Sequence, residues 1–335
     1  ERYGGERSPL AALAALPLSA VLYERNKTTR AEEILARQVG NASEWGLVDQ
    51  FVAGYVTQTK ILLSHAEEEE ALAVLDEGMA LALDRNLERL RLSLVAEHLR
   101  LLSNRQAGSR AQVLQYGRTA GIETSRKAVV AKPGSRGVDE LMALCWFRVA
   151  LAKHEFADAS HVARGWRRYC HASGAELSAV RWTILLAEAQ LLDGDSRTAQ
   201  RTLREAVAAA APMGICRSFL DEGTSIKTLL ESCCQAASGS SHPADTYAIE
   251  LLKAFGGRVP DKDVMSEEGV YGTLTDREIE VLLQVGSGMR NKEVAESMGM
   301  TEGSVKWYMQ QIFDKLGTRS RVQAVERARK LGLIN

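Results

Sequence analysis

The chain has 335 residues, which is more than one compact domain usually contains, so we expect two units or an extended repeat array. Hydrophobic residues make up 45% and charged residues 25%, a composition that can build a core and excludes a disordered chain. Lys and Arg number 42 against 43 Asp and Glu, which gives a formal net charge of -1. This balance excludes a protein that coats nucleic acid through charge alone.

The first two thirds of the chain has the composition and periodicity of helices. No proline lies between Pro17 and Pro133, and Ala, Leu, Glu and Arg dominate this interval. Apolar residues recur at the spacing of one helical face, as at Leu72, Leu75 and Met79. Polar breaks divide the region into four predicted helix pairs, at about 44–64 with 67–84, 87–105 with 109–121, 139–154 with 156–172, and 176–192 with 196–211.

These pairs recur at roughly 40-residue steps, apart from one longer step. The pattern predicts an all-α fold that begins with an α-solenoid of tetratricopeptide-like helix pairs over residues 1–235, with a groove along its concave side. The longer step contains residues 124–138, whose Lys-Pro-Gly-Ser-Arg-Gly run predicts an irregular surface loop. Asp193-Gly194-Asp195 is interpreted as a turn between helices rather than as a cation site.

A linker is expected at residues 236–272, because these positions are small and polar or rich in Gly, Asp and Glu. One helix, at about 244–255, interrupts it. The remaining residues, 273–335, carry ten Lys and Arg against eight Asp and Glu, so this segment is only mildly basic. It is predicted to be a separate domain of short, dense helices.

Four helices are predicted in this last segment. Thr275 and Glu278 form a capping-box pair at the start of the first helix. The second helix opens at Asn291, and Thr301 caps the third, which runs to Leu316. Because two short helices are joined by a glycine-containing turn within a four-helix unit, the pattern predicts a helix-turn-helix.

The third helix presents two different faces. Its inner stripe is apolar and comprises Val305, Met309, Ile312 and Leu316. Trp307 and Gln310 fall on the opposite face, with Lys306 on the flank. Lys and Gln can hydrogen-bond base edges and an apolar side chain can meet a thymine methyl group, so this face is interpreted as one that reads the major groove of DNA. The alternative is that Trp307 packs on the solenoid or on a second subunit.

Both parts of the chain resemble known regulators. The C-terminal segment resembles the LuxR-type helix-turn-helix in Leu274-Thr275-x-Arg277-Glu278-x-Glu280-Val281-Leu282, Asn291-Lys292-Glu293-Val294-Ala295, Ser304-Val305-Lys306 and Lys315-Leu316-Gly317. Upstream, Cys216-Arg217-Ser218-Phe219-Leu220-Asp221-Glu222-Gly223 and Leu251-Leu252-x-Ala254-Phe255 resemble the end of the helical-repeat region in the MalT-like group of large ATP-dependent LuxR regulators. The resemblance implies a transcriptional regulator, an activator in this group, whose helical repeats sense an effector and whose C-terminus binds promoter DNA.

Carried over position by position, the resemblance assigns base contacts to Lys306, Trp307 and Gln310. It assigns phosphate contacts to four residues near helix N-termini, namely Asn291, Lys292, Thr301 and Ser304. Tyr308 stands where the family often has His, and Thr301 where it often has Ser; both departures leave the docking mode intact. Paired half-sites on DNA need paired modules, so self-association is expected, with the dimer surface on the fourth helix at Val322, Val325 and Leu331.

Other partners and cofactors follow from the same resemblance. A small-molecule effector is expected in the groove of the helical repeats, and RNA polymerase is a further partner. Regulators of this group carry a nucleotide-binding domain in front of the repeats, but the sequence contains no GxxxxGK[ST] motif, so we expect a fragment without that domain and without an ATP site or other cofactor. A cytoplasmic location is expected, because the five cysteines suggest no disulfide framework and no apolar stretch is long enough for a membrane helix.

Two other function classes have less support in the sequence. The six histidines show no metal-ligand spacing and no nucleophile lies beside a base, so no catalytic or metal site and no enzyme activity are expected. A protein–protein interaction scaffold with a helix-turn-helix docking module is the second alternative. The predicted exposure of Lys306 and Trp307 on one face argues against the scaffold.

Overall fold

The computed structural model describes residues 9–45, 47–105, 109–122, 125–236, 243–256, 274, 276–298, 300–316, 318, 320–330 and 333–334. The chain divides into two compact units, Glu1–Cys233 and Cys234–Asn335. Within the described ranges every regular element is helical, so the predicted all-α class is confirmed. No helix among the described residues is long and apolar enough to cross a membrane.

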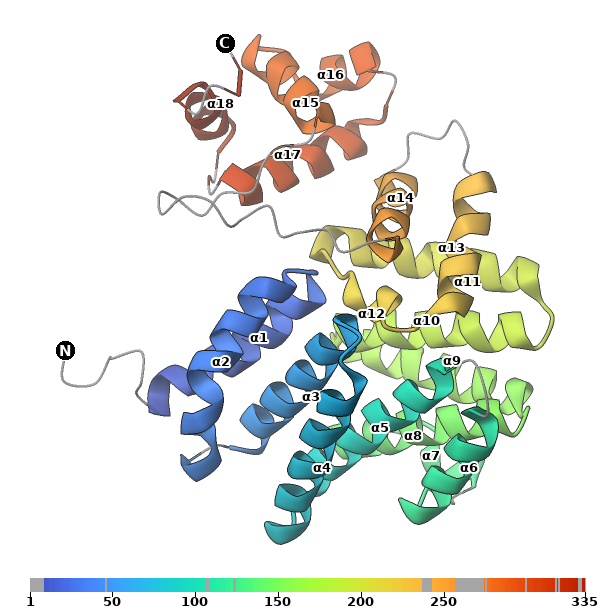
Figure 1. The fold of residues 1–335 in the computed structure, drawn as a ribbon. Helices are drawn as coiled ribbons and strands as arrows, with labels where there is room; N and C mark the ends of the chain where they lie inside the picture. Colours follow the sequence, from blue (N-terminus) through green and yellow to red (C-terminus); the bar gives the residue numbers. More distant parts are fainter. Residues whose placement is uncertain are drawn as a thin grey trace. The chain divides into compact units, whose positions relative to one another are not determined.

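The first unit is an array of antiparallel helix pairs (Figure 1). The pairs are α1 (Pro9–Glu24) with α2 (Thr28–Trp45), α3 (Val48–Ser64) with α4 (Glu68–Asp84), α5 (Glu88–Asn104) with α6 (Ser109–Thr119), α8 (Gly137–Ala152) with α9 (Phe156–Ala172), and α10 (Glu176–Leu192) with α11 (Ser196–Ala210). The last four are the predicted pairs. The pair α1–α2 was not predicted, because Pro17 lies inside α1 and interrupts its apolar pattern.

One type of turn recurs between the helices. After each of several helices a residue adopts a left-handed conformation, such as Ala66 at φ 63° and Gly194 at φ 91°. The next N–H then bonds the carbonyl five positions back, as from Glu67 to Leu62 at 3.0 Å and from Asp195 to the preceding helix at 3.0 Å. This is the Schellman closure, which fixes the direction in which the following helix leaves. The repeated closure explains the regular spacing of the pairs.

The first helices of successive pairs pack side by side, in the order α1, α3, α5 and α8. After α11 come a short 3₁₀ turn at Ala211–Met213, α12 (Arg217–Leu220) and α13 (Thr224–Ala236). Helix α12 contacts both α1 and α10, and Figure 1 shows it between them. We call residues 216–223 the closing segment, because they join the last pair of the array to the first.

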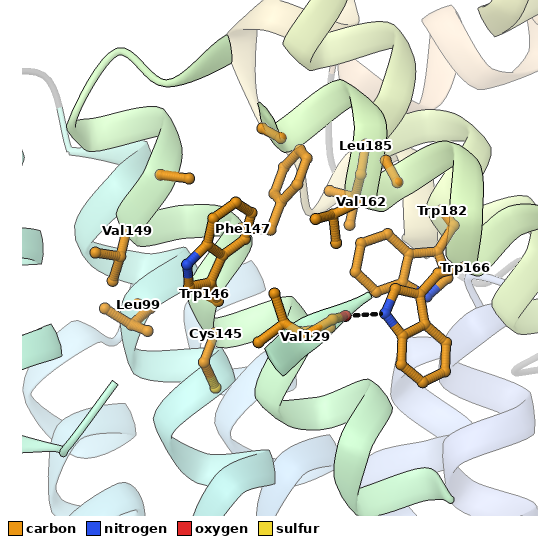
Figure 2. Close-up of a cluster of buried hydrophobic side chains, with 14 of the residues drawn as sticks. Leu99, Val129, Cys145, Trp146, Phe147, Val149, Val162, Trp166, Trp182 and Leu185 are labelled. Atoms are coloured by element: carbon orange, nitrogen blue, oxygen red, sulfur yellow. Dashed lines mark hydrogen bonds between the residues drawn. The ribbon is translucent and has the colours of Figure 1, made fainter. Parts of the chain in front are cut away.

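The main core lies between α5, α8, α9 and α10 and contains aromatic side chains (Figure 2). Trp166 and Trp182 are stacked with ring centroids 6.0 Å apart, and Phe147 meets Trp182 edge-on at 6.1 Å. The indole Nε1 of Trp166 donates to the carbonyl of Val129 at 2.7 Å. Val129 belongs to a short helix, α7 (Arg126–Val129). The prediction of an irregular loop at 124–138 therefore needs correction, because part of it is helical and closes the core.

The second unit contains α14 (Pro243–Phe255), at the position predicted for the helix in the linker. The four predicted helices follow as α15 (Asp276–Gly286), α16 (Asn291–Met298), α17 (Glu302–Leu316) and α18 (Arg321–Lys330). Their core includes side chains that are 0% exposed on each of α15, α16 and α17, namely Val281, Leu282, Val294, Val305 and Ile312. Thr275 lies outside the described residues, so the structure gives no account of the predicted capping box at α15.

Candidate functional site

The ends of α16 and α17 are fixed by side-chain caps. Ahead of α16 the backbone N–H of Arg290 donates to the carboxylate of Glu293 at 2.6 Å. Thr301 caps α17 as predicted, since its Oγ1 accepts from the backbone N–H of Ser304 at 3.1 Å. These caps define the short connection between the two helices and set the angle at which α17 leaves it.

Helix α17 turns one face to the core of its unit and the other to solvent. Its buried residues are Ser304, Val305, Tyr308, Met309, Ile312 and Leu316, which include the whole predicted inner stripe. Of the residues predicted to contact bases, Lys306 and Gln310 are exposed. The Lys306 ammonium lies 3.1 Å from the carboxylate of Glu302, and both side chains are at least half exposed. The side chain of Trp307 lies outside the described residues, so the structure does not test its predicted contact with a base.

The residues predicted to contact phosphates lie in two environments. Lys292 and Thr301 are exposed, and Asn291 is half-buried. Ser304 is 3% exposed, and its hydroxyl lies 2.9 Å from the hydroxyl of Thr301 inside the cap. Ser304 therefore helps to hold the start of α17, and its hydroxyl is shared with that of the exposed Thr301.

The predicted dimer residues on α18 also lie in different environments. Val322 is 75% exposed, whereas Val325 packs against the core of its own unit. Leu331 lies outside the described residues. One contact of α18 was not predicted: the Arg321 guanidinium donates to the carbonyls of Val285 and Met289, which connects the start of α18 to the turn after α15.

The first unit contains a cavity of about 180 Å³. Its walls come from α3, α5, α8, α10 and the closing segment, so residues far apart in the sequence meet there. Apolar side chains of α3, α8 and α10 form one part of the lining, and charged residues form another. The sequence predicted a groove in this unit but none of the lining residues.

A buried ionic network borders the cavity. Arg148, which is 6% exposed, donates to the carboxylate of Glu188 at 3.0 Å and to that of Glu222. Burial raises the pKa of Glu188 to about 7, because Arg148 only partly offsets the loss of water and the repulsion from Glu222. For Glu97 the balance is opposite: burial would raise its pKa, but Arg100 and Lys60 outweigh burial and lower it to about 2.

The network also holds the closing segment in place. Asp221 accepts a hydrogen bond from the Tyr23 hydroxyl of α1 at 3.0 Å, and its backbone carbonyl accepts from Asn104 of α5 at 2.8 Å. The backbone N–H of Cys216 donates to the carbonyl of Glu24 at 2.9 Å. Asp221 and Glu222 therefore both line the cavity and belong to the closing segment, which α13 follows in the chain.

The raised pKa of Glu188 predicts a pH-dependent contribution to stability. Its pKa is about 7 in the folded chain and near 4.5 when unfolded, so the folded state binds more protons between these values. The stabilisation by the neutral acid is fully present below about pH 4.5 and is lost as the pH rises through 7. Glu188→Gln lacks this titrating group, so its stability should not fall for this reason. We expect the stability of Glu188→Gln minus that of the wild type to increase as the pH rises from 5 to 8. Melting temperatures of the two proteins across this range test it; a constant difference, or a change of the opposite sign, would contradict it.

No group of three or more His, Cys, Asp or Glu side chains able to hold a metal ion occurs among the described residues. The described cysteines are free, and burial raises the pKa of Cys145 to about 12, so this thiol is unreactive at neutral pH.

An array of tetratricopeptide-like helix pairs followed by a helix-turn-helix unit defines a helical-repeat protein with a C-terminal DNA-binding module. Comparison with protein families agrees with both parts. The model of the MalT-like TPR region matches residues 1–236, and that of the bacterial regulatory proteins of the luxR family matches residues 272–328. The chain belongs to the MalT-like family, and it carries a LuxR-type helix-turn-helix domain.

Several curated proteins are similar to this chain. The HTH-type transcriptional regulator AlkS of Ectopseudomonas oleovorans is 25% identical over 317 residues, which cover 93% of this chain and 34% of AlkS. AlkS of Pseudomonas putida is 26% identical over 313 residues, with the same coverage. The transcriptional regulatory protein LnrK of Bacillus subtilis is 53% identical over 51 residues, 15% of this chain and 23% of LnrK. The chain thus spans about a third of the length of the AlkS proteins. No solved structure matches it significantly.

Proposed function

We propose that this chain is the sensing and DNA-binding part of a transcriptional regulator. The helix-turn-helix domain, residues 273–335, reads promoter DNA in the major groove through α17. The helical-repeat domain, residues 1–235, binds a small-molecule effector in its cavity, and residues 236–272 link the two. The similarity to AlkS and LnrK, both named as regulators of transcription, supports the first of these roles.

The observation that carries DNA reading is the division of α17 into two faces. Its apolar stripe packs against α15, α16 and α18, which fixes the orientation of the helix. Lys306 and Gln310 then face solvent, where an ammonium and an amide can hydrogen-bond base edges. Lys292 and Thr301 lie at the N-termini of α16 and α17, where exposed N–H groups favour phosphate oxygens.

The mild charge of the helix-turn-helix domain has a consequence for DNA binding. A net charge of +2 over residues 273–335 allows few phosphate contacts, so a single copy gains little non-specific affinity. Two copies on adjacent half-sites, about 34 Å apart, supply the missing contacts. Self-association is therefore part of the proposal. Of the predicted dimer residues that the structure describes, Val322 is the more exposed, at 75%.

The cavity and the closing segment support the sensing role. Ser218, Asp221 and Glu222 line the cavity and belong to the segment that joins α10 to α1. An effector that contacts these residues binds the closed arrangement and an opened one with different affinities, which is what a population shift requires. Because α13 follows the closing segment directly, the shift acts on the connection to the DNA-binding unit.

Selection from a pool of randomised DNA tests the proposed function. We expect the wild-type chain to enrich one sequence motif, arranged as two half-sites whose centres lie about 10 base pairs apart. The enriched site should bind at least about 1,000-fold more tightly than unrelated DNA. Recovery of no common motif, with similar affinity for all DNA, would contradict sequence reading by α17.

A further inference from the structure

The cavity of the first unit has an unequal distribution of charge. Four cationic side chains line it: Lys60, Arg100, Arg148 and Arg181. Three of them have acidic partners, since Lys60 and Arg100 share Glu97 at 3.2 and 2.9 Å, and Arg148 bridges Glu188 and Glu222.

Arg181 differs from the other three. It lies on α10, is half-buried, and forms no ion pair or side-chain hydrogen bond with any residue that the structure describes. A guanidinium carries five N–H donors and stays charged at any physiological pH. A half-buried guanidinium on a cavity wall without an acidic partner is therefore an open position for an anion.

The rest of the lining limits the shape of that anion. Val52, Val56, Leu141, Leu144 and Leu185, from α3, α8 and α10, give the cavity an apolar part of its lining. A volume of about 180 Å³ is below the roughly 300–1,000 Å³ of pockets for drug-sized ligands, so the occupant is small. A small occupant with an apolar body and one anionic end matches both parts of the lining.

The number of unpaired positive charges limits the chemical class of the ligand further. One carboxylate can form two parallel hydrogen bonds with a single guanidinium. A phosphate ester carries nearly two negative charges, and the second would face Glu97, Asp221 and Glu222, which also line the cavity. A neutral ligand would leave Arg181 without a partner. We propose that the cavity binds a small carboxylic acid with an apolar body, held at its carboxylate by Arg181.

This proposal rests on the proposed sensing role and names the chemical class of the effector. The probes are hexanoate and benzoate, each compared with its uncharged amide, in calorimetric titrations of the whole chain. Arg181→Gln removes the charge and keeps most of the side-chain length. Arg164→Gln is the matched control, because Arg164 is an exposed arginine on α9 that does not line the cavity.

We expect at least one acid to bind about tenfold or more tightly than its amide, as a charge-assisted bidentate contact provides. Arg181→Gln should abolish this preference while its melting temperature stays close to that of the wild type, and Arg164→Gln should retain it. Equal binding of acid and amide, an unchanged preference in Arg181→Gln, or no binding by any of the four probes would overturn the proposal.

The ligand titration and the DNA selection use the same protein but have independent readouts. Failure of the carboxylate proposal can therefore be distinguished from failure of DNA reading. If a motif is enriched and the amides bind as well as the acids, the sensing role stands and the carboxylate class is wrong. If a motif is enriched and no probe binds, the carboxylate class is also wrong and DNA reading stands.

Discussion

Replacing Arg148 with alanine is expected to lower the free energy of unfolding of the first unit by about 3–5 kcal/mol at pH 8, because above its pKa of about 7 Glu188 is ionised and the change leaves two buried carboxylates without a counter-charge. Glu188 and Glu222 are each 7% exposed, and both accept hydrogen bonds from the same guanidinium. Denaturant unfolding followed by tryptophan fluorescence measures the loss, since Trp146, Trp166 and Trp182 are buried in the core of this unit.

A second variant separates charge from volume at this site. The triple change Arg148→Met, Glu188→Gln and Glu222→Gln removes all three charges and keeps the space filled. Its stability should lie near that of the wild type, because well-packed neutral residues often replace a buried ion pair without loss. The defect of Arg148→Ala should also become smaller at pH 5, where protonation removes the uncompensated charge. A loss below about 1 kcal/mol for Arg148→Ala, or an equal loss in the triple variant, would contradict the account.

The periodicity of the sequence was sufficient to predict the helix pairs and the four-helix unit. Polar breaks such as those at His154 and Gly194 coincide with the left-handed turns between helices, because residues that end a helix are recognisable locally. The inner stripe of α17 was predictable for the same reason, since its 3.6-residue repeat depends only on neighbouring positions.

The cavity was not predictable, because it depends on contacts between residues far apart in the chain. Tyr23 and Asp221 are 198 positions apart, and no periodic pattern connects them. One local signal was present: Arg148 stands alone in the apolar run Leu-Cys-Trp-Phe-Arg-Val-Ala-Leu-Ala. A charge on the buried face of a helix requires a buried partner, and α10 and the closing segment supply it.

Lys306 and Lys292 are expected to affect DNA binding in different ways. Lys306 lies on the exposed face of α17, so we expect its removal to lower affinity for the selected site about 10- to 100-fold and to leave affinity for unrelated DNA nearly unchanged. Lys292 lies at the start of α16, where it contacts phosphates in our proposal, so its removal should weaken binding to all DNA by a similar factor. Neither change should affect folding, since both side chains are exposed and the Lys306–Glu302 ion pair contributes little.

The ratio of affinities for the selected site and for a scrambled site, at one fixed salt concentration, tests the reading of DNA by α17 most directly. It should be measured for the wild type, Lys306→Ala and Lys292→Ala, with equal melting temperatures as proof of folding. The account predicts that the ratio falls about 10- to 100-fold in Lys306→Ala and stays at the wild-type value in Lys292→Ala. A wild-type ratio in Lys306→Ala would contradict it.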